Sequence, residues 1–156
     1  MTRPLLLNLV AASILSVATT AAPAGAQDRG SKAIVVVVSA VNPVKSLELA
    51  HVRRLFLRIQ TVWQNGTPVA VFERSSDHPI RAAFSSTFLG KSQGEMEEYW
   101  FNVSLTRGLE PPKICRTASL LKQYLDRTQG GIGYVYEDEL LEGMKIVARL
   151  DLKALE

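Results

Sequence analysis

The sequence has little of what most metal, thiol and nucleic-acid sites require. It contains one Cys and two His among 156 residues, which excludes an internal disulfide framework and a Cys-x-x-Cys metal site. The net charge is only +3. Lys and Arg are scattered, with no basic run longer than Arg53-Arg54. We therefore expect no nucleic-acid partner, no metal and no cofactor.

A nucleotide loop and a catalytic constellation are also missing from the pattern. Gly90-Lys91-Ser92 imitates the end of a phosphate-binding P-loop, but Ser85 stands where that motif needs glycine. His51, His78 and Cys115 fall in separate predicted elements, and no acidic partner beside them suggests a nucleophile with its base. We expect that the protein is not an enzyme.

Long hydrophobic runs are confined to the N-terminus. Arg3 is followed by an apolar stretch from Leu5 to Val17, which is too short to cross the roughly 30 Å hydrocarbon core of a bilayer. Ala24-Gly25-Ala26 then matches the A-x-A cleavage pattern. We predict a signal peptide over residues 1–26, cleaved near Ala26, and one domain over residues 27–156. The predicted location is periplasmic or secreted.

After the signal peptide, the pattern alternates between strands and helices. The β-branched run from Ala33 to Ser39 is typical of a strand buried on both faces. Apolar residues at helical spacing and capping signals predict four helices further along. We predict strands over residues 33–39, 68–72, 132–136 and 145–150; helices beginning near Ser46, over 79–89, at the Ser92–Glu95 capping box and at Thr117 or Ser119; a loop over 108–113; and a short turn or helix over 138–141. This order predicts a three-layer α/β fold, a mixed sheet with helices on both faces.

One loop has the strongest chemical character. Arg74-Ser75-Ser76-Asp77 lies between the strand that ends near Glu73 and the helix that begins near Pro79. Such a loop presents backbone N–H groups to an anion. Arg74 adds a guanidinium fork, Ser75 and Ser76 add hydroxyl donors, and Asp77 can accept from the O–H of a protonated anion. Arg74, Ser75, Ser76 and Asp77 are the predicted anion-binding residues. In the alternative, Ser76 or Asp77 caps the helix and Arg74 points into solvent.

From this loop outward, the sequence resembles the phosphate-binding, periplasmic substrate-binding proteins of ABC transporters. The resemblance covers roughly residues 33–136 and depends on the order of several short motifs. In chain order these are the apolar strand and Asn (Ile34 to Asn42), Arg-x-x-Phe (Arg53 to Phe56), Trp-x-x-Gly (Trp63 to Gly66), Arg-Ser (Arg74-Ser75), Phe84, Leu89-Gly90, Trp100, Gly108 with Pro111-Pro112, and Gly131-Ile132-Gly133-Tyr134-Val135.

The resemblance implies one lobe of a type II periplasmic binding protein. Family members have two lobes that close around the anion, and this chain has the length of one. Their phosphate loop continues from Arg-Ser into Ser-Gly-Thr, whereas here the aligned residues are His78, Pro79 and Ile80. Arg74 and Ser75 therefore carry over from the family. The hydroxyl groups of the family's Ser and Thr are missing here, and Pro79 has no backbone N–H to offer an anion.

Two functions follow from the resemblance. The first is reversible binding of phosphate or a related oxyanion for an ABC transport system, with an ABC permease or another membrane protein as partner. The second is an interaction module that keeps the fold, binds no ligand and acts with a membrane or periplasmic protein. Arg74-Ser75 favours the first function, and the missing Ser-Gly-Thr favours the second.

Overall fold

The structure is a computed structural model that describes residues 33–152. The predicted signal peptide and its cleavage site lie outside these residues. The elements in chain order are β1 (Ile34–Ser39), α1 (Leu49–Phe56), β2 (Ala70–Arg74), α2 (Pro79–Phe84), the π-helix η1 (Ser85–Leu89), α3 (Gln93–Arg107), β3 (Lys113–Cys115), α4 (Ala118–Arg127), β4 (Gly131–Tyr136), the 3-10 helix η2 (Glu137–Glu139) and β5 (Met144–Leu150).

Five strands form one mixed sheet in the order β3-β2-β4-β1-β5. β2 pairs in parallel with both β3 and β4, whereas β1 runs antiparallel to β4 and β5. Because β2, β3 and β4 point the same way, their carboxyl ends share one edge of the sheet. That edge, which we call the carboxyl edge, carries the segments 75–78, 116–117 and 137–139.

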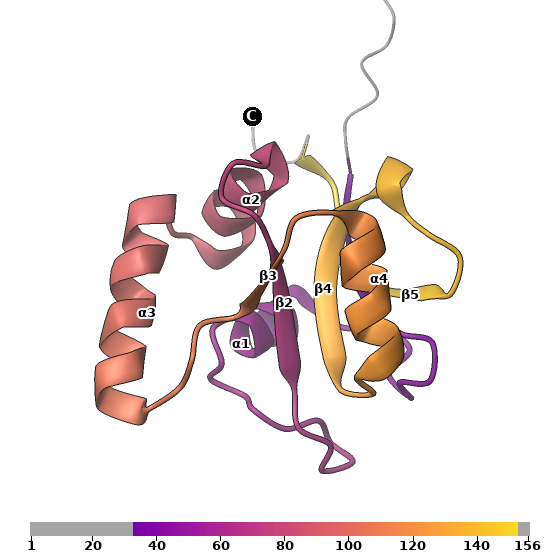
Figure 1. Ribbon diagram of the computed structural model, residues 1–156, viewed down its shortest axis with the longest axis horizontal. Helices are drawn as coiled ribbons and strands as arrows, with labels where there is room; N and C mark the ends of the chain where they lie inside the picture. Colours follow the sequence, from indigo (N-terminus) through magenta and orange to yellow (C-terminus); the bar gives the residue numbers. More distant parts are fainter. Residues whose placement is uncertain (1–32, 153–156) are drawn as a thin grey trace, which may run out of the picture.

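β1 is an inner strand between β4 and β5, and all of its residues are buried. Its side chains alternate between the two faces of the sheet. Ile34, Val36 and Val38 pack with residues of α1, α2, η1 and α3, whereas Val35 and Val37 pack with residues of α4. Figure 1 shows α4 in front of the sheet and α1 behind it. The predicted three-layer α/β fold with helices on both faces is confirmed.

The first helix begins later than its predicted cap. Ser46 belongs to a segment without helix or strand, and α1 starts at Leu49 after Glu48, which makes no side-chain cap. The backbone N–H of Leu47 donates to the carbonyl of Val147 in β5 at 2.7 Å. The prediction of Ser46 as N-cap is wrong, because this hydrogen bond holds the segment before α1 against β5, the outer strand of the sheet.

The second predicted helix changes its winding halfway. It is α-helical only to Phe84 and continues as a π-helix to Leu89. Gly90, at φ 66°, closes the segment in the left-handed conformation, as its predicted role as C-cap requires. The apolar spacing of residues 79–89 does not distinguish the two windings, so the sequence predicted one continuous helix.

The remaining helices follow their capping signals. Ser92 Oγ accepts from the N–H of Glu95 at 3.3 Å, and Glu95 Oε2 accepts from the N–H of Ser92 at 2.7 Å. This is the predicted capping box of α3. Of the two predicted caps for α4, Thr117 is the one used, accepting from the N–H of Leu120 at 3.1 Å. Within residues 33–152, no helix has both the length and the apolar character needed to cross a membrane.

β1, β4 and β5 begin within one residue of their predicted starts, whereas β2 is shifted by two residues and β3 is new. β2 begins at Ala70 and includes Arg74, so it runs two residues beyond the predicted end at Phe72. β3 (Lys113–Cys115) was not predicted: the predicted loop over residues 108–113 includes its first residue, and residues 114–115 were assigned to no element. Its three residues carry no period-two pattern of burial, and pairing with β2 holds them in the sheet. The added strand brings Arg116 to the carboxyl edge.

Candidate functional site

The predicted anion loop lies at the carboxyl edge of the sheet. Parallel α/β sheets bind their ligands at this edge, where loops from neighbouring strands meet. Here the loop after β2 contributes residues 75–78, the end of β3 contributes Arg116, and the end of β4 contributes η2. The strand order therefore assembles three segments that are far apart in the sequence.

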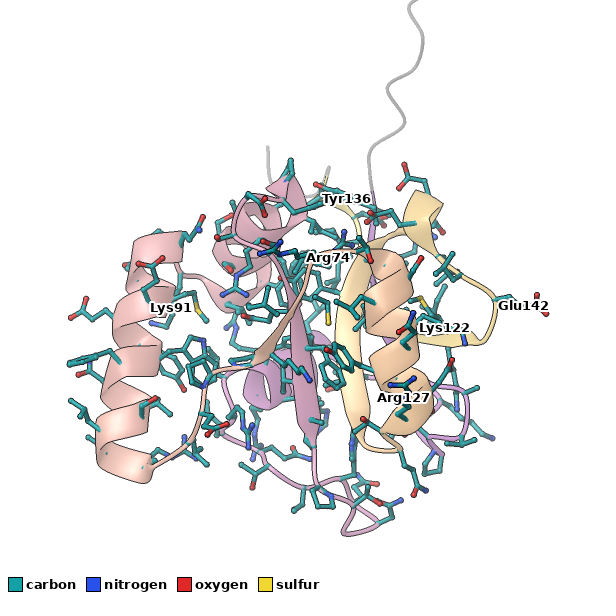
Figure 2. All side chains as sticks on the ribbon, viewed as in Figure 1. Arg74, Lys91, Lys122, Arg127, Tyr136 and Glu142 are labelled. Atoms are coloured by element: carbon teal, nitrogen blue, oxygen red, sulfur yellow. The ribbon has the colours of Figure 1, made fainter. Side chains whose placement is uncertain are left out.

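Arg74 is the last residue of β2, and its guanidinium group is already paired. Its side chain is 2% exposed. Nη1 donates to Glu139 Oε2 at 2.9 Å, and Nη2 donates to Glu139 Oε1 at 3.1 Å. The backbone N–H of Tyr136 donates to the same Oε2 at 3.2 Å. Figure 2 shows Arg74 and Tyr136 at this end of the sheet. The alternative in which Arg74 points into solvent is therefore wrong.

Glu139 is a residue of this site that the sequence analysis missed. Burial of its carboxyl group raises its pKa, but the hydrogen bonds and positive charge of Arg74 outweigh this effect. The net result is a pKa below the usual value, so the carboxyl group is ionised at neutral pH. The only sequence signal was an acidic run, Glu137-Asp138-Glu139, directly after a strand.

Ser75, Ser76 and Asp77 form a tight turn after β2. The N–H of His78 closes the turn by donating to the carbonyl of Ser75 at 3.0 Å. Ser75 is half-buried, whereas Ser76 and Asp77 are exposed. A hydrogen bond from the Ser75 side chain lowers the pKa of Asp77, with smaller contributions from Arg116 and His78. Asp77 is therefore an ionised acceptor beside two basic residues.

His78 takes the capping role that was predicted for Ser76 or Asp77. Its Nδ1 accepts from the N–H of Ile80 at 3.3 Å, so it is the N-cap of α2. Prediction of a Ser or Asp cap is wrong here because the turn places the imidazole over the first free N–H. With Nδ1 as acceptor, the neutral ring carries its proton on Nε2, and Nε2 lies 3.7 Å from Glu139 Oε1.

A pocket of about 320 Å³ opens beside this turn. Its lining consists of Ser75, Asp77, His78, Pro79 and Arg116. The pocket brings together two of the four predicted anion-binding residues, Ser75 and Asp77. Arg74 lies buried at the strand end, and Ser76 does not line the pocket. Arg116, an exposed residue of this pocket, was missed because the sequence analysis did not place β3 next to β2.

A second ion pair lies buried near the strand end. Arg81 of α2 pairs with Glu73 of β2, whose side chain is 1% exposed. Burial lowers the pKa of Arg81. Burial also raises the pKa of Tyr134 to about 12, although Arg81 and Arg74 act in the opposite direction. Because Glu73 already neutralises Arg81, this arginine adds no free positive charge to the pocket.

The surroundings of Cys115 do not favour its use as a nucleophile. Burial raises the pKa of this thiol to about 11, so it is protonated at neutral pH. Gly90-Lys91-Ser92-Gln93-Gly94 has the spacing of a nucleophile elbow, but it joins η1 to α3 instead of a strand to a helix. Ser92 is the N-cap of α3. Across residues 33–152, no three His, Cys, Asp or Glu side chains are placed to hold a metal ion.

A larger hollow lies at the opposite edge of the sheet. It has a volume of about 450 Å³ and is formed by residues 43–47 after β1, part of α1 and residues 60–64 before β2. Its basic groups are Lys45 and His51. We place the candidate site at the carboxyl edge because the predicted loop and the ends of three parallel strands meet there.

No protein-family model matches the sequence, and no curated protein matches it. Solved structures do match. An ABC-type phosphate transport receptor from Vibrio cholerae aligns with a TM-score of 0.60 and 17% identity, over 74% of this chain and 45% of the receptor. A putative phosphate ABC transporter substrate-binding protein from Clostridium perfringens, with bound phosphate, aligns with a TM-score of 0.60 and 19% identity, over 74% and 44%. PstS from Borrelia burgdorferi aligns with a TM-score of 0.57 and 10% identity, over 75% of this chain and 47% of PstS.

The chain has the fold of one lobe of these binding proteins. It spans less than half of their length. The resemblance seen in the order of short motifs is therefore confirmed at the level of the fold.

Proposed function

We propose that the protein reversibly binds an oxyanion, with inorganic phosphate as the first candidate, as a substrate-binding component of an ABC-type transport system outside the cytoplasm. The binding pocket is the one at the carboxyl edge, beside the turn that follows β2. The observation that carries this proposal is the convergence of Ser75, His78 and Arg116 on one pocket of about 320 Å³.

The geometry of this pocket suits an anion that is held without covalent chemistry. Arg116 supplies a guanidinium fork, and the hydroxyl of Ser75 and the Nε2–H of His78 supply further donors. Asp77 is an ionised acceptor on the pocket wall. Arg74 stands at the end of β2 and joins the donors when its pairing with Glu139 opens.

Support also comes from the fold. The matching proteins from Vibrio cholerae and Clostridium perfringens are described as phosphate transport components, and the second carries phosphate. Cleavage of the predicted signal peptide near Ala26 would deliver residues 27–156 to the periplasm or the cell exterior, where such components work.

Calorimetric titration of the protein with phosphate and sulfate tests the proposal. We expect saturable heat and a rise in melting temperature at millimolar anion, because a ligand of the native state stabilises it. Arg116→Ala should weaken binding by about ten-fold or more. The matched control is Arg127→Ala, at the other end of α4 in Figure 2, which should leave affinity unchanged. Absence of both heat and stabilisation in the wild type would exclude anion binding.

A second candidate is a ligand-free interaction module of the same fold, with a membrane or periplasmic protein as partner. Two observations favour it: Glu139 fills the fork of Arg74, and His78-Pro79-Ile80 stands in place of Ser-Gly-Thr. If the wild type gives no heat with any oxyanion and keeps its melting temperature, this second function becomes the better account.

A further inference from the structure

We propose that Glu139 is an internal competing ligand that lowers the affinity of the anion site for external oxyanions. Its carboxylate is a built-in ligand of Arg74, and an oxyanion reaches the guanidinium group only by replacing it. This inference rests on the proposed function, because His78 lines the proposed pocket and its Nε2 lies 3.7 Å from Glu139 Oε1, so that exchange at Arg74 would extend that pocket.

The contacts of Glu139 are those of a bound anion. Both of its oxygens accept from the terminal nitrogens of Arg74, at 2.9 and 3.1 Å, and one also accepts from the N–H of Tyr136 at 3.2 Å. The second basic group is His78, with Nε2 3.7 Å from Glu139 Oε1. Two oxygens held in one guanidinium fork, with a backbone N–H beside them, are also how proteins hold phosphate and sulfate.

The two members of the pair differ in their freedom to leave. Arg74 ends a strand that is paired on both sides, its side chain is 2% exposed, and its Nε is buried without a hydrogen-bond partner within the described residues. Glu139 ends a three-residue 3-10 turn, and its side chain is 28% exposed. Exchange therefore proceeds by rotation of Glu139 into solvent while Arg74 stays in place.

The place of Glu139 in the fold also explains why it competes. β2 and β4 are parallel neighbours, so the turn after β4 begins beside the end of β2. The acidic turn is thereby brought to the guanidinium group by strand order alone. An intramolecular carboxylate competes at all times, and the apparent affinity for an external anion falls in proportion to the fraction of molecules in which Glu139 has swung away.

The experiment measures sulfate binding by calorimetry in the wild type, Glu139→Gln and Glu139→Asp. Sulfate is chosen because its charge does not change near neutral pH. We expect Glu139→Gln to bind sulfate about ten-fold more tightly or better, because the competing charge is removed. Glu139→Asp keeps the charge but shortens the reach, so its affinity should lie between those two. A melting curve for each variant establishes that it folds.

Glu137→Gln is the matched control. Glu137 belongs to the same turn and carries the same charge, but its carboxylate pairs with Arg149 of β5. Its substitution should leave sulfate affinity within about two-fold of the wild type. An equal gain in this control would show that general charge, and not the occupied fork, limits binding.

The remaining outcomes separate this inference from the proposed function. If the wild type binds sulfate and Glu139→Gln binds no more tightly, the inference is wrong and the function stands. If Glu139→Gln binds sulfate and the wild type does not, the inference stands, and the phosphate titration of the wild type decides the proposed function. If none of the proteins binds sulfate, the inference is overturned, and the same phosphate titration decides the proposed function. If Glu139→Gln does not fold, the same comparison is made with Glu139→Asp.

Discussion

At the scale of single residues, the pairing of Arg74 with Glu139 links stability to pH. The pKa of Glu139 is lowered in the folded protein: burial raises it, and Arg74 more than compensates. A carboxyl group with a depressed folded pKa stabilises the fold above its unfolded pKa. That stabilisation is lost as the pH falls through the folded pKa. The Arg74–Glu139 pair therefore stabilises the folded protein at neutral pH, and this stabilisation is lost in acid.

Urea unfolding of the wild type and Glu139→Gln between pH 7 and pH 3 tests this linkage. At pH 7 we expect the variant to be less stable by about 1–3 kcal/mol, because a buried guanidinium group loses a charged hydrogen-bond partner. Below about pH 4, where carboxyl groups begin to be protonated, the difference should narrow. Asp77 and Glu95 also have lowered pKa values, but both proteins keep them. A difference that stays constant with pH would contradict the assigned role of Arg74.

Some site residues can be recognised from the order of residues along the chain, whereas others depend on which strands are neighbours in the sheet. The place of Ser75 and Asp77 in the turn after β2 could be predicted, because a strand followed by a polar turn and a helix is visible along the chain. Arg116 and Glu139 could not, because their approach to the site depends on β3 and β4 flanking β2. His78 was assigned no role because the pattern favoured Ser or Asp as the helix cap.

At the scale of elements, glycines set how closely β4 meets its neighbours. A Cβ on Gly133 would lie 2.6 Å from Leu121 Cδ1 of α4. A Cβ on Gly130 would lie 1.9 Å from the carbonyl oxygen of Pro68, in the segment leading to β2. Trp63 Nε1 also donates to the carbonyl of Gly130 at 3.0 Å. The backbone before β4 is therefore pressed against the residues that precede β2.

Gly130→Ala tests this close approach. Because the clash is with backbone, the chain itself must shift, and we expect a loss of at least about 2 kcal/mol in the free energy of unfolding. Gly94→Ala in α3 is the control, since its Cβ would meet nothing within 4 Å. The control should be neutral or more stable by up to about 1 kcal/mol. Equal denaturant midpoints for the two variants would contradict the packing at β4.

Elements with strong local signals could be predicted, and those held by tertiary contacts could not. The β-branched run of β1 predicted burial on both faces because only an inner strand can hide every side chain. The capping box of α3 marked its start in the same local way. In contrast, β3 exists through its pairing with β2, and the late start of α1 depends on the bond between Leu47 and Val147.

At the scale of the whole molecule, the described residues provide one wall of the proposed anion site. The pocket opens on the carboxyl edge of a single sheet, and the chain spans about 45% of the Vibrio cholerae receptor. An anion in this pocket keeps contact with solvent, and its hydrogen bonds and charge–charge interactions are weaker there than in a closed cleft. We therefore expect fast exchange and modest affinity.

Amide NMR spectra recorded during a phosphate titration test whether an oxyanion binds at the carboxyl edge. We expect saturable shifts for the backbone amides of Ser75, Asp77, His78 and Arg116, with residues 43–47 and 60–64 at the opposite edge unchanged. Saturable shifts around those two segments instead, or no saturable shift at any amide, would contradict it.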